Sequence, residues 1–344
     1  MAGSRKKKRT GLKVFIILVL IIAAAGAFIV FGPNTGRLTK GEYLYIRTGS
    51  TYSTVIKQLE EGNYIREMIG FKLLAERANY PNKVKAGRYR IKPGMSSYNI
   101  IRMLRNGTQE PVKLVINKLR TKQDFITFVS SQLEADSTEM KRLMQDNAFL
   151  AEYELDSNTA MAAIIPDTYE FFWNTSAEKA FRKIAKNYKR FWNDERKKLA
   201  TSKNLSPAQV ITMASIVEEE TNKTADKGPI ASVYINRIAK GMPLQADPTV
   251  KFAVGDFSIR RVTGVHLVKD SPYNTYIYKG LPPGPICTPS QATINAVLKA
   301  PSTDYIYFCA APALDGSSLF AATYEEHMKN ARAYQQALNE RNIH

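Results

Sequence analysis

The sequence predicts an α+β protein that follows a single N-terminal membrane helix. The first observation is an unbroken apolar run over residues 14–31. The second is that residues 42–117 alternate short strand patterns with amphipathic helices, and the third is that residues 118–344 are mostly helical patterns with a few short strands. Hydrophobic residues make up 44% of the chain, which argues against disorder. The roughly 300 residues after the apolar run are enough for two domains.

The N-terminus has the pattern of a membrane anchor. Residues 4–13 contain six cations and no acidic residue, and the apolar run of 18 residues follows. At ~1.5 Å per residue this run forms about 27 Å of helix, enough to cross a bilayer with help from its flanks. The positive-inside rule predicts a cytoplasmic tail at 1–13, a span at 14–32 and an exported remainder, on the outer or periplasmic side of the cytoplasmic membrane. A cleavable signal peptide is the alternative, but the apolar run continues through residues 28–31 beyond the small residues at 23–27.

The first exported region, residues 33–117, is predicted to be a linker followed by a small α+β module. Such a module has too little acidic chemistry for catalysis, so we expect it to bind or position a ligand. Strands are expected at 43–47, 87–91 and 111–116, and helices at 51–60, 69–77 and 96–105.

The second region, residues 118–344, is predicted to be a mixed α+β catalytic domain. Three of its loops, at 244–249, 271–276 and 280–285, are rich in polar side chains together with Gly and Pro. Such loops suit a sugar-binding cleft, although they can equally be plain connections. Helices are expected at 123–132, 137–145, 177–203, 206–221, 230–240, 291–299 and 324–342, and strands at 164–169 and 304–310.

One helix carries the strongest chemical signal. Ser206 is a good N-cap and Pro207 suits the first helical position. The residues three, four and seven positions before Glu220 are all apolar, so this carboxyl group continues a buried stripe, whereas Glu218 and Glu219 lie on more mixed faces. Desolvation disfavours the charged form, which can make a glutamate a proton donor near neutral pH. The alternative is that an acidic cluster at a helix end is simply solvated.

The composition indicates which kinds of binding partner and cofactor the chain is expected to have. The net charge is +18, and subtracting the six N-terminal cations leaves 18 − 6 = +12, which suggests an acidic partner or a generally basic surface. No nucleic-acid-binding motif is present, so no nucleic acid is expected. Cys287 and Cys309 are expected to be buried free thiols, although an exported location would allow them to pair. The three histidines lack metal-ligand spacing and no nucleotide-binding motif occurs, so neither a metal nor a cofactor is expected.

Three segments together resemble a known family. The runs MASIVEEET at 213–221, ASVYINRIAKGMPLQADPTV at 231–250 and SPYNTYIYKGLPPGPI at 271–286 closely resemble the endolytic murein (peptidoglycan) transglycosylases, also called the MltG or YceG-like family. The resemblance covers most of residues 40–340, and the small module resembles the family's LysM-like domain. It implies a membrane-anchored lytic transglycosylase that cleaves peptidoglycan glycan strands internally, without a cofactor. It also implies a link to the peptidoglycan synthases.

The resemblance assigns site residues position by position. The second glutamate of the family's E-x-E-T pattern is its catalytic residue, and it corresponds to Glu220. The positions that match cleft residues of the family, and are expected to bind substrate, are Glu218, Gln245, Asp247, Tyr273, Asn274 and Thr275. Asp167 and Tyr169 match a PDTY element in which a structural turn is an equal interpretation. Glu219 stands where the family often has Lys, and its charge is expected to raise the pKa of Glu220 further.

The implied reaction needs one carboxyl group. Glu220 would protonate the oxygen that links N-acetylmuramic acid to N-acetylglucosamine, then accept the proton of the muramic C6 hydroxyl as a 1,6-anhydro ring closes. Two alternatives stay open. A lysozyme-like hydrolase would use Asp247 or Glu218 to activate water, and a non-catalytic scaffold of the cell-wall machinery would not need Glu220 at all.

Overall fold

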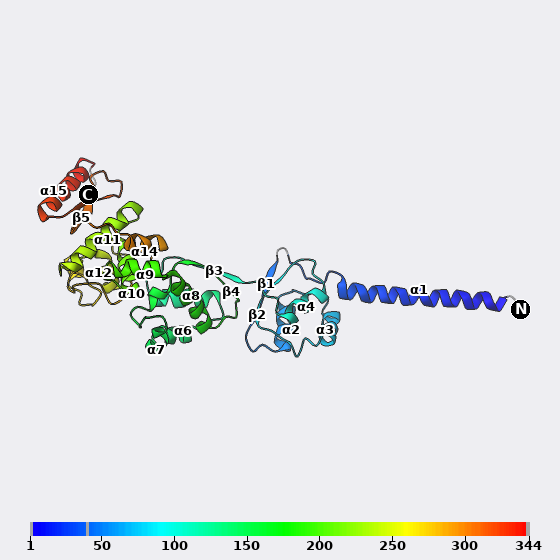
Figure 1. The fold of residues 1–344 in the computed structure, drawn as a ribbon. Coiled ribbons are helices and arrows are strands. Elements are labelled where there is room, and N and C mark those ends of the chain that lie inside the picture. The colour runs from blue at the N-terminus through cyan, green and yellow to red at the C-terminus, as the bar shows by residue number, and fades with distance from the viewer. Residues whose placement is uncertain (1–2, 39–40, 342–344) are drawn as a thin grey trace. The chain divides into compact units, whose positions relative to one another are not determined.

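The computed structural model describes residues 3–38 and 41–341 and has a mixed α+β fold, as predicted (Figure 1). The chain divides into two compact units. Unit 1 is the chain up to Lys113 with residues 132–134 and 170–175, and unit 2 is the rest. The predicted ends of the cytoplasmic tail at residue 13, of the membrane span at residue 32 and of the small module at residue 117 stay predictions.

Unit 1 begins with a long apolar helix, α1. Within the described residues, its segment Gly11–Phe31 is the one helix long and apolar enough to cross a membrane. Its side chains are exposed, as at Leu20, of which 62% is accessible. The elements that follow match the sequence prediction closely. The elements of unit 1 are α1 (Gly3–Phe31), β1 (Glu42–Ile46), α2 (Tyr52–Glu61), α3 (Met68–Arg77), β2 (Gly87–Ile91) and α4 (Ser97–Asn106).

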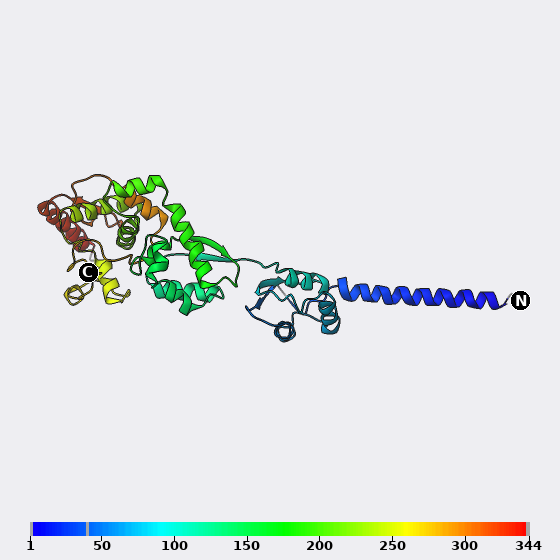
Figure 2. The same ribbon diagram turned by 60° about the horizontal axis from the view of Figure 1, so that its bottom comes forward.

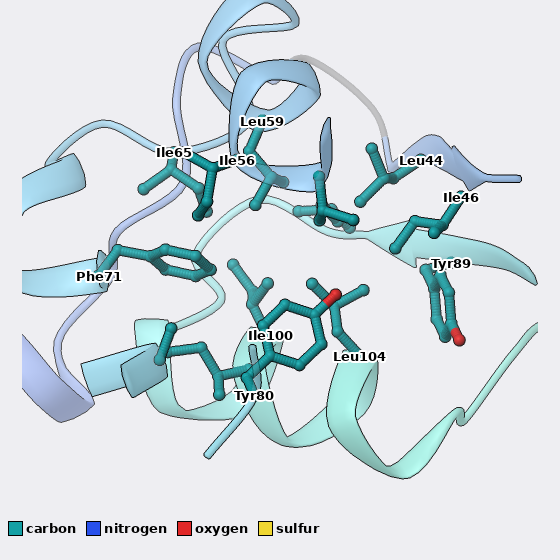
Figure 3. Close-up of a cluster of buried hydrophobic side chains, with 14 residues drawn as sticks. Leu44, Ile46, Ile56, Leu59, Ile65, Phe71, Tyr80, Tyr89, Ile100 and Leu104 are labelled. Atoms are coloured by element: carbon teal, nitrogen blue, oxygen red, sulfur yellow. The ribbon is translucent and has the colours of Figure 1, made fainter. Parts of the chain in front are cut away.

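An antiparallel β1–β2 pair and three helices enclose the core of unit 1. Glu42 pairs with Ile91 and Ile46 with Gly87, so Leu44, Ile46, Tyr89 and Ile91 face inward. Figure 3 shows Leu44, Ile46 and Tyr89 in one cluster with Phe71, Tyr80, Ile100 and Leu104, and Ile91 belongs to the same cluster. Helix α4 ends at Gly107, whose φ of +74° is the left-handed conformation that glycine adopts without strain.

Strand β3 (Val112–Ile116) pairs with β4 (Asp167–Phe171), and the division between the units runs through both strands. The strand predicted at 164–169 begins three residues later and ends two residues later in the structure, at 167–171. Tyr169 is buried, and its hydroxyl donates to Ile165 O at 2.8 Å, which is a structural role for the PDTY element.

Unit 2 is mainly helical. Its remaining elements are α5 (Lys122–Gln132), α6 (Ser137–Leu143), α7 (Asn147–Ala151), the 3₁₀ turn η1 (Ala160–Ala163), α8 (Ala177–Phe191), α9 (Asp194–Thr201), α10 (Pro207–Glu220), α11 (Thr224–Ala239), α12 (Asp247–Val254), α13 (Gly264–Leu267), α14 (Gln291–Leu298), β5 (Tyr307–Ala310), β6 (Ser318–Ala321) and α15 (Tyr324–Glu340). Figures 1 and 2 show α15 beside the β5–β6 hairpin.

Several predicted elements of unit 2 were wrong in detail. The helix predicted at 177–203 is two helices, because Asn193 starts a new one by accepting the Arg196 amide. Helix α11 begins six residues earlier than predicted, and the loop predicted at 244–249 contains the start of α12. The strand around Cys309 was predicted to be buried, but it is only half-buried because it forms a two-stranded hairpin with β6.

Candidate active site

Helix α10 places the glutamate cluster. Ser206 Oγ accepts the Gln209 amide, and Gln209 Oε1 accepts the Ser206 amide at 2.8 Å, so a capping box starts the helix. The helix is buried from Val210 to Val217 and ends at Glu220, because Thr221 is extended, with φ −146°. The predicted start of the helix is confirmed.

Glu220 faces Tyr234 of α11. The buried Tyr234 hydroxyl donates to Glu220 Oε1 at 2.8 Å. The pKa of Glu220 is raised to about 7, chiefly because burial disfavours the charged carboxylate. The negative charge of Asp247 raises the pKa further. The hydrogen bond from Tyr234 and the positive charge of Lys251 lower it. A carboxyl group with a pKa near 7 can donate a proton at neutral pH and accept one in the next step.

The other two glutamates point to different partners. Glu218 Oε2 lies 2.9 Å from Lys227 Nζ and also accepts hydrogen bonds from Ser290 and Thr293. Burial works against ionisation of Glu218, but these partners hold its pKa below the usual value. Its carboxylate is therefore engaged inside the protein.

Glu219 forms an ion pair with Lys118 at 2.8 Å and with Arg120 at 3.1 Å. Burial raises the pKa of Glu219, but the two cations more than compensate and lower it overall. The expectation that Glu219 raises the pKa of Glu220 was wrong, since the carboxylate that has this effect is Asp247.

Asp247 is the exposed first residue of α12 and accepts a hydrogen bond from the Tyr276 hydroxyl at 2.6 Å. The neighbouring Gln245 has a left-handed backbone, with φ +53°, and its side-chain oxygen accepts from Arg237 Nη1 at 3.2 Å. Arg237 also donates to Leu244 O and Ile306 O, so it fixes the loop before α12. Gln245 and Asp247 are thus on one short segment, and the charge of Asp247 acts on Glu220.

The YNTY segment is divided between loop construction and the site. Asn274 is fully buried, and its Nδ2 donates to Leu267 O and Lys269 O, both at 2.8 Å. Thr275 is 1% exposed, and its Oγ1 accepts the Ala246 amide. Because their polar groups are used internally, we assign both residues to holding the loop. Tyr273 is half-buried, with its ring 4.7 Å from that of Phe252.

Sequence reasoning missed three members of this site: Tyr234, Lys251 and Tyr276. Tyr234 and Tyr276 occur in the runs that carry the family resemblance, but nothing in the pattern shows that their hydroxyls meet Glu220 and Asp247. No group of three or more His, Cys, Asp or Glu suited to a metal ion occurs among the residues described by the structure. Cys287 and Cys309 are free thiols, the first buried and the second half-buried.

Comparisons with known proteins agree with one another. The model of the YceG-like family matches residues 44–333. An endolytic murein transglycosylase of Bacillus subtilis (strain 168) is 30% identical over an alignment of 315 positions that covers 86% of this chain and 85% of the relative. One from Streptococcus pneumoniae (D39) is 26% identical over 92% of this chain, and the match spans 63% of that relative's length. A crystal structure of a yceG-like protein from Listeria monocytogenes is 30% identical, with a TM-score of 0.55, over 85% of this chain and 99% of that one.

Proposed function

The chain belongs to the YceG-like family, and we propose that it is a membrane-anchored endolytic lytic transglycosylase that cleaves peptidoglycan. It cuts the β-1,4 bond between N-acetylmuramic acid and N-acetylglucosamine within glycan strands and leaves 1,6-anhydro-muramic ends. The observation that carries this proposal is Glu220, a carboxyl group with a pKa raised to about 7 beside a buried tyrosine hydroxyl.

In the first step Glu220 acts as a general acid. Its proton goes to the glycosidic oxygen, the bond from that oxygen to C1 of muramic acid breaks, and positive charge develops on the sugar ring. Glu220 becomes a carboxylate in this step. The hydrogen bond from Tyr234 and the charge of Lys251 stabilise this ionised form, which limits the cost of forming it in a desolvated site.

In the second step the same carboxylate acts as a general base. It takes the proton of the muramic C6 hydroxyl while the C6 oxygen bonds to C1, and the anhydro ring closes. Glu220 returns to its protonated state and no water is consumed. A pKa near 7 suits both steps, because one group must donate and accept a proton at the same pH.

Asp247 and Gln245 are proposed to position the sugar, and Asp247 also to stabilise the positive charge on the ring. Its carboxylate is exposed and oriented by Tyr276, so it is available to substrate. Tyr273 offers a half-buried aromatic ring, which suits an apolar sugar face. The +12 charge outside the N-terminal tail fits peptide stems that carry carboxylates.

Helix α1 and the small module are proposed to hold the enzyme at the membrane. We propose that α1 is an uncleaved single-pass anchor, with the basic tail in the cytoplasm and the rest on the outer side of the cytoplasmic membrane. Residues 33–117 are proposed as a LysM-like module that positions glycan near the membrane. A partnership with peptidoglycan synthases is proposed from the family alone.

Digestion of purified peptidoglycan tests the reaction. The full chain in detergent and its Glu220→Gln variant are incubated with glycan strands, and the fragments are analysed by mass spectrometry. We expect internal fragments with anhydro-muramic ends from the wild type only. Cleavage by the Gln variant at the wild-type rate would remove Glu220 from the mechanism, and no cleavage by either protein would favour the scaffold.

A lysozyme-like hydrolase is the second candidate, because an exposed carboxylate, Asp247, acts on the charge state of Glu220. Two carboxyl groups can serve as acid and base with a water molecule between them. Hydrolysis gives reducing muramic ends that are one water heavier than anhydro ends, so the same digestion distinguishes the two reactions.

A further inference from the structure

The segment that follows α1 is clamped between the first turns of α3 and α4. Asn34 is 5% exposed, and its Nδ2 donates to Glu67 O and to Ser97 Oγ, each at 2.8 Å. Its Oδ1 accepts the Glu67 amide at 2.8 Å, and its own amide donates to Met95 O at 3.0 Å. Four hydrogen bonds therefore fix the end of α1 to unit 1.

The last turn of α1 also packs directly on these two helices. The ring of Phe31 lies 5.3 Å from that of Tyr98 at the start of α4. A Cβ atom on Gly70 of α3 would lie 2.6 Å from Ile29 Cγ2, so only glycine allows this close approach. If α1 spans the membrane as proposed, the first turns of α3 and α4 lie where the hydrocarbon region meets the headgroups.

Side chains on these turns suit that depth. Ile69 is 82% exposed and Leu73, one helical turn later on the same face, is 59% exposed. Tyr98 is 40% exposed, and tyrosine is enriched where membranes meet water. The acidic Glu67 caps α3 by accepting the Ile69 and Gly70 amides, so its charge is satisfied within the protein.

A basic groove lies between α3 and α4. It encloses about 350 Å³, and Arg77, Arg102 and Arg105 contribute to its walls. Arg102 stacks over Tyr98 at 5.6 Å, and Arg105 Nε is buried without a hydrogen-bond partner. None of the three arginines takes part in the ion pairs found in the described ranges, whereas four other arginines do. Guanidinium groups match phosphate geometry, so the groove is suited to an anion of that kind.

We propose that the α3–α4 groove binds the phosphate headgroups of anionic phospholipids in the leaflet from which unit 1 emerges. This rests on the proposed anchoring by α1. The apolar side chains of α3 contact the acyl boundary, the three arginines hold headgroup phosphates, and the Asn34 clamp keeps both at the correct depth. Unit 1 is then a membrane-surface module as well as a glycan-positioning one, and it lies against the leaflet instead of swinging on a linker.

Lipid titration of the full chain tests this proposal. The detergent-solubilised protein is titrated with phosphatidylglycerol or phosphatidylcholine, and native mass spectrometry gives the Kd of the first lipid adduct. We expect preference for phosphatidylglycerol. A basic residue near an anionic surface contributes about a fivefold effect, so replacing Arg77, Arg102 and Arg105 by Gln weakens phosphatidylglycerol binding about 100-fold. Replacing all three by Lys keeps most of the binding.

A matched triple variant controls for charge. Arg47→Gln, Lys83→Gln and Lys113→Gln remove three exposed cations of unit 1 that do not line the groove, and this variant keeps the wild-type Kd. Equal binding of both lipids, equal loss in both triple variants, or displacement of lipid by millimolar inorganic phosphate would each overturn the proposal. A matching Tm for the groove variant and wild type shows that folding is intact.

Two further measurements separate this proposal from the proposed function. Carbonate extraction of the wild type from membranes would overturn the anchor and the groove proposal together. Peptidoglycan digestion by the groove variant should still give anhydro-muramic ends, since its substitutions lie outside the catalytic site. A wild type that binds phosphatidylglycerol selectively but does not cleave peptidoglycan leaves the groove proposal standing and refutes the enzymatic one.

Discussion

Replacing Tyr234 by Phe removes one hydroxyl that donates to Glu220 Oε1 at 2.8 Å and leaves the ring in place. A hydrogen bond to a charged group contributes about 1.5–3 kcal/mol. One pKa unit corresponds to about 1.36 kcal/mol, so loss of this hydrogen bond raises the pKa of Glu220 from about 7 to about 8–9. The carboxylate formed after the first proton transfer loses the same stabilisation, so kcat falls about 10- to 100-fold.

The pH profile of kcat/KM reads this pKa directly. Free enzyme must carry the proton of Glu220, so activity falls as pH rises through about 7 in the wild type and through about 8–9 in the variant. The control is Tyr169→Phe, which removes another buried hydroxyl bonded to Ile165 O. An alkaline limb that stays in place or moves to lower pH in Tyr234→Phe would refute this reasoning.

Two further predictions concern Glu220 and one concerns Glu218. Asp247→Asn removes a negative charge that raises the pKa of Glu220, so the alkaline limb of kcat/KM moves to lower pH, opposite to Tyr234→Phe; an upward move contradicts this. Glu220→Gln removes a pH-dependent contribution to stability. In the folded wild type the pKa of Glu220 is raised from 4.5 to about 7, so the stability that this group contributes below pH 4.5 is lost as pH rises through 7. The variant is therefore about 3 kcal/mol more stable than wild type in urea at pH 8 and equal at pH 4; a constant difference contradicts this. Lys227→Met leaves the largely buried Glu218 carboxylate without its cation and costs about 3–5 kcal/mol of unfolding free energy, whereas Lys57→Met, in a pair 73% and 67% exposed, costs under about 1 kcal/mol; equal losses contradict this.

The sequence predicted Glu220 because its signals are local. The N-cap Ser206, the proline in the first turn and the apolar spacing before Glu220 all lie within 15 residues of one another, and each has a direct physical meaning in a helix. The small module was predicted for the same reason. Its strands alternate cleanly, and Thr51 and Ser96 cap its helices as the pattern indicates.

The partners of the glutamates could not be predicted, because they are distant in sequence. Arg120 reaches Glu219 across 99 residues and Thr293 reaches Glu218 across 75. Only the fold shows that Glu218 and Glu219 pair with cations and that Glu220 accepts a hydrogen bond from a tyrosine. Helix α12 was missed because Ala246, its N-cap residue, makes no side-chain cap, and Asp247 with Pro248 has the composition of a turn.

Digestion in ¹⁸O-labelled water tests the central claim most directly. The full chain cleaves purified glycan strands in H₂¹⁸O, the products are reduced at once with borohydride, and mass spectrometry reads the muramic ends. We predict anhydro ends that resist reduction and contain no ¹⁸O, because the C6 hydroxyl closes the ring in place of water. Reducible ends that contain one ¹⁸O would show that water attacks C1, and the chain would then be a hydrolase.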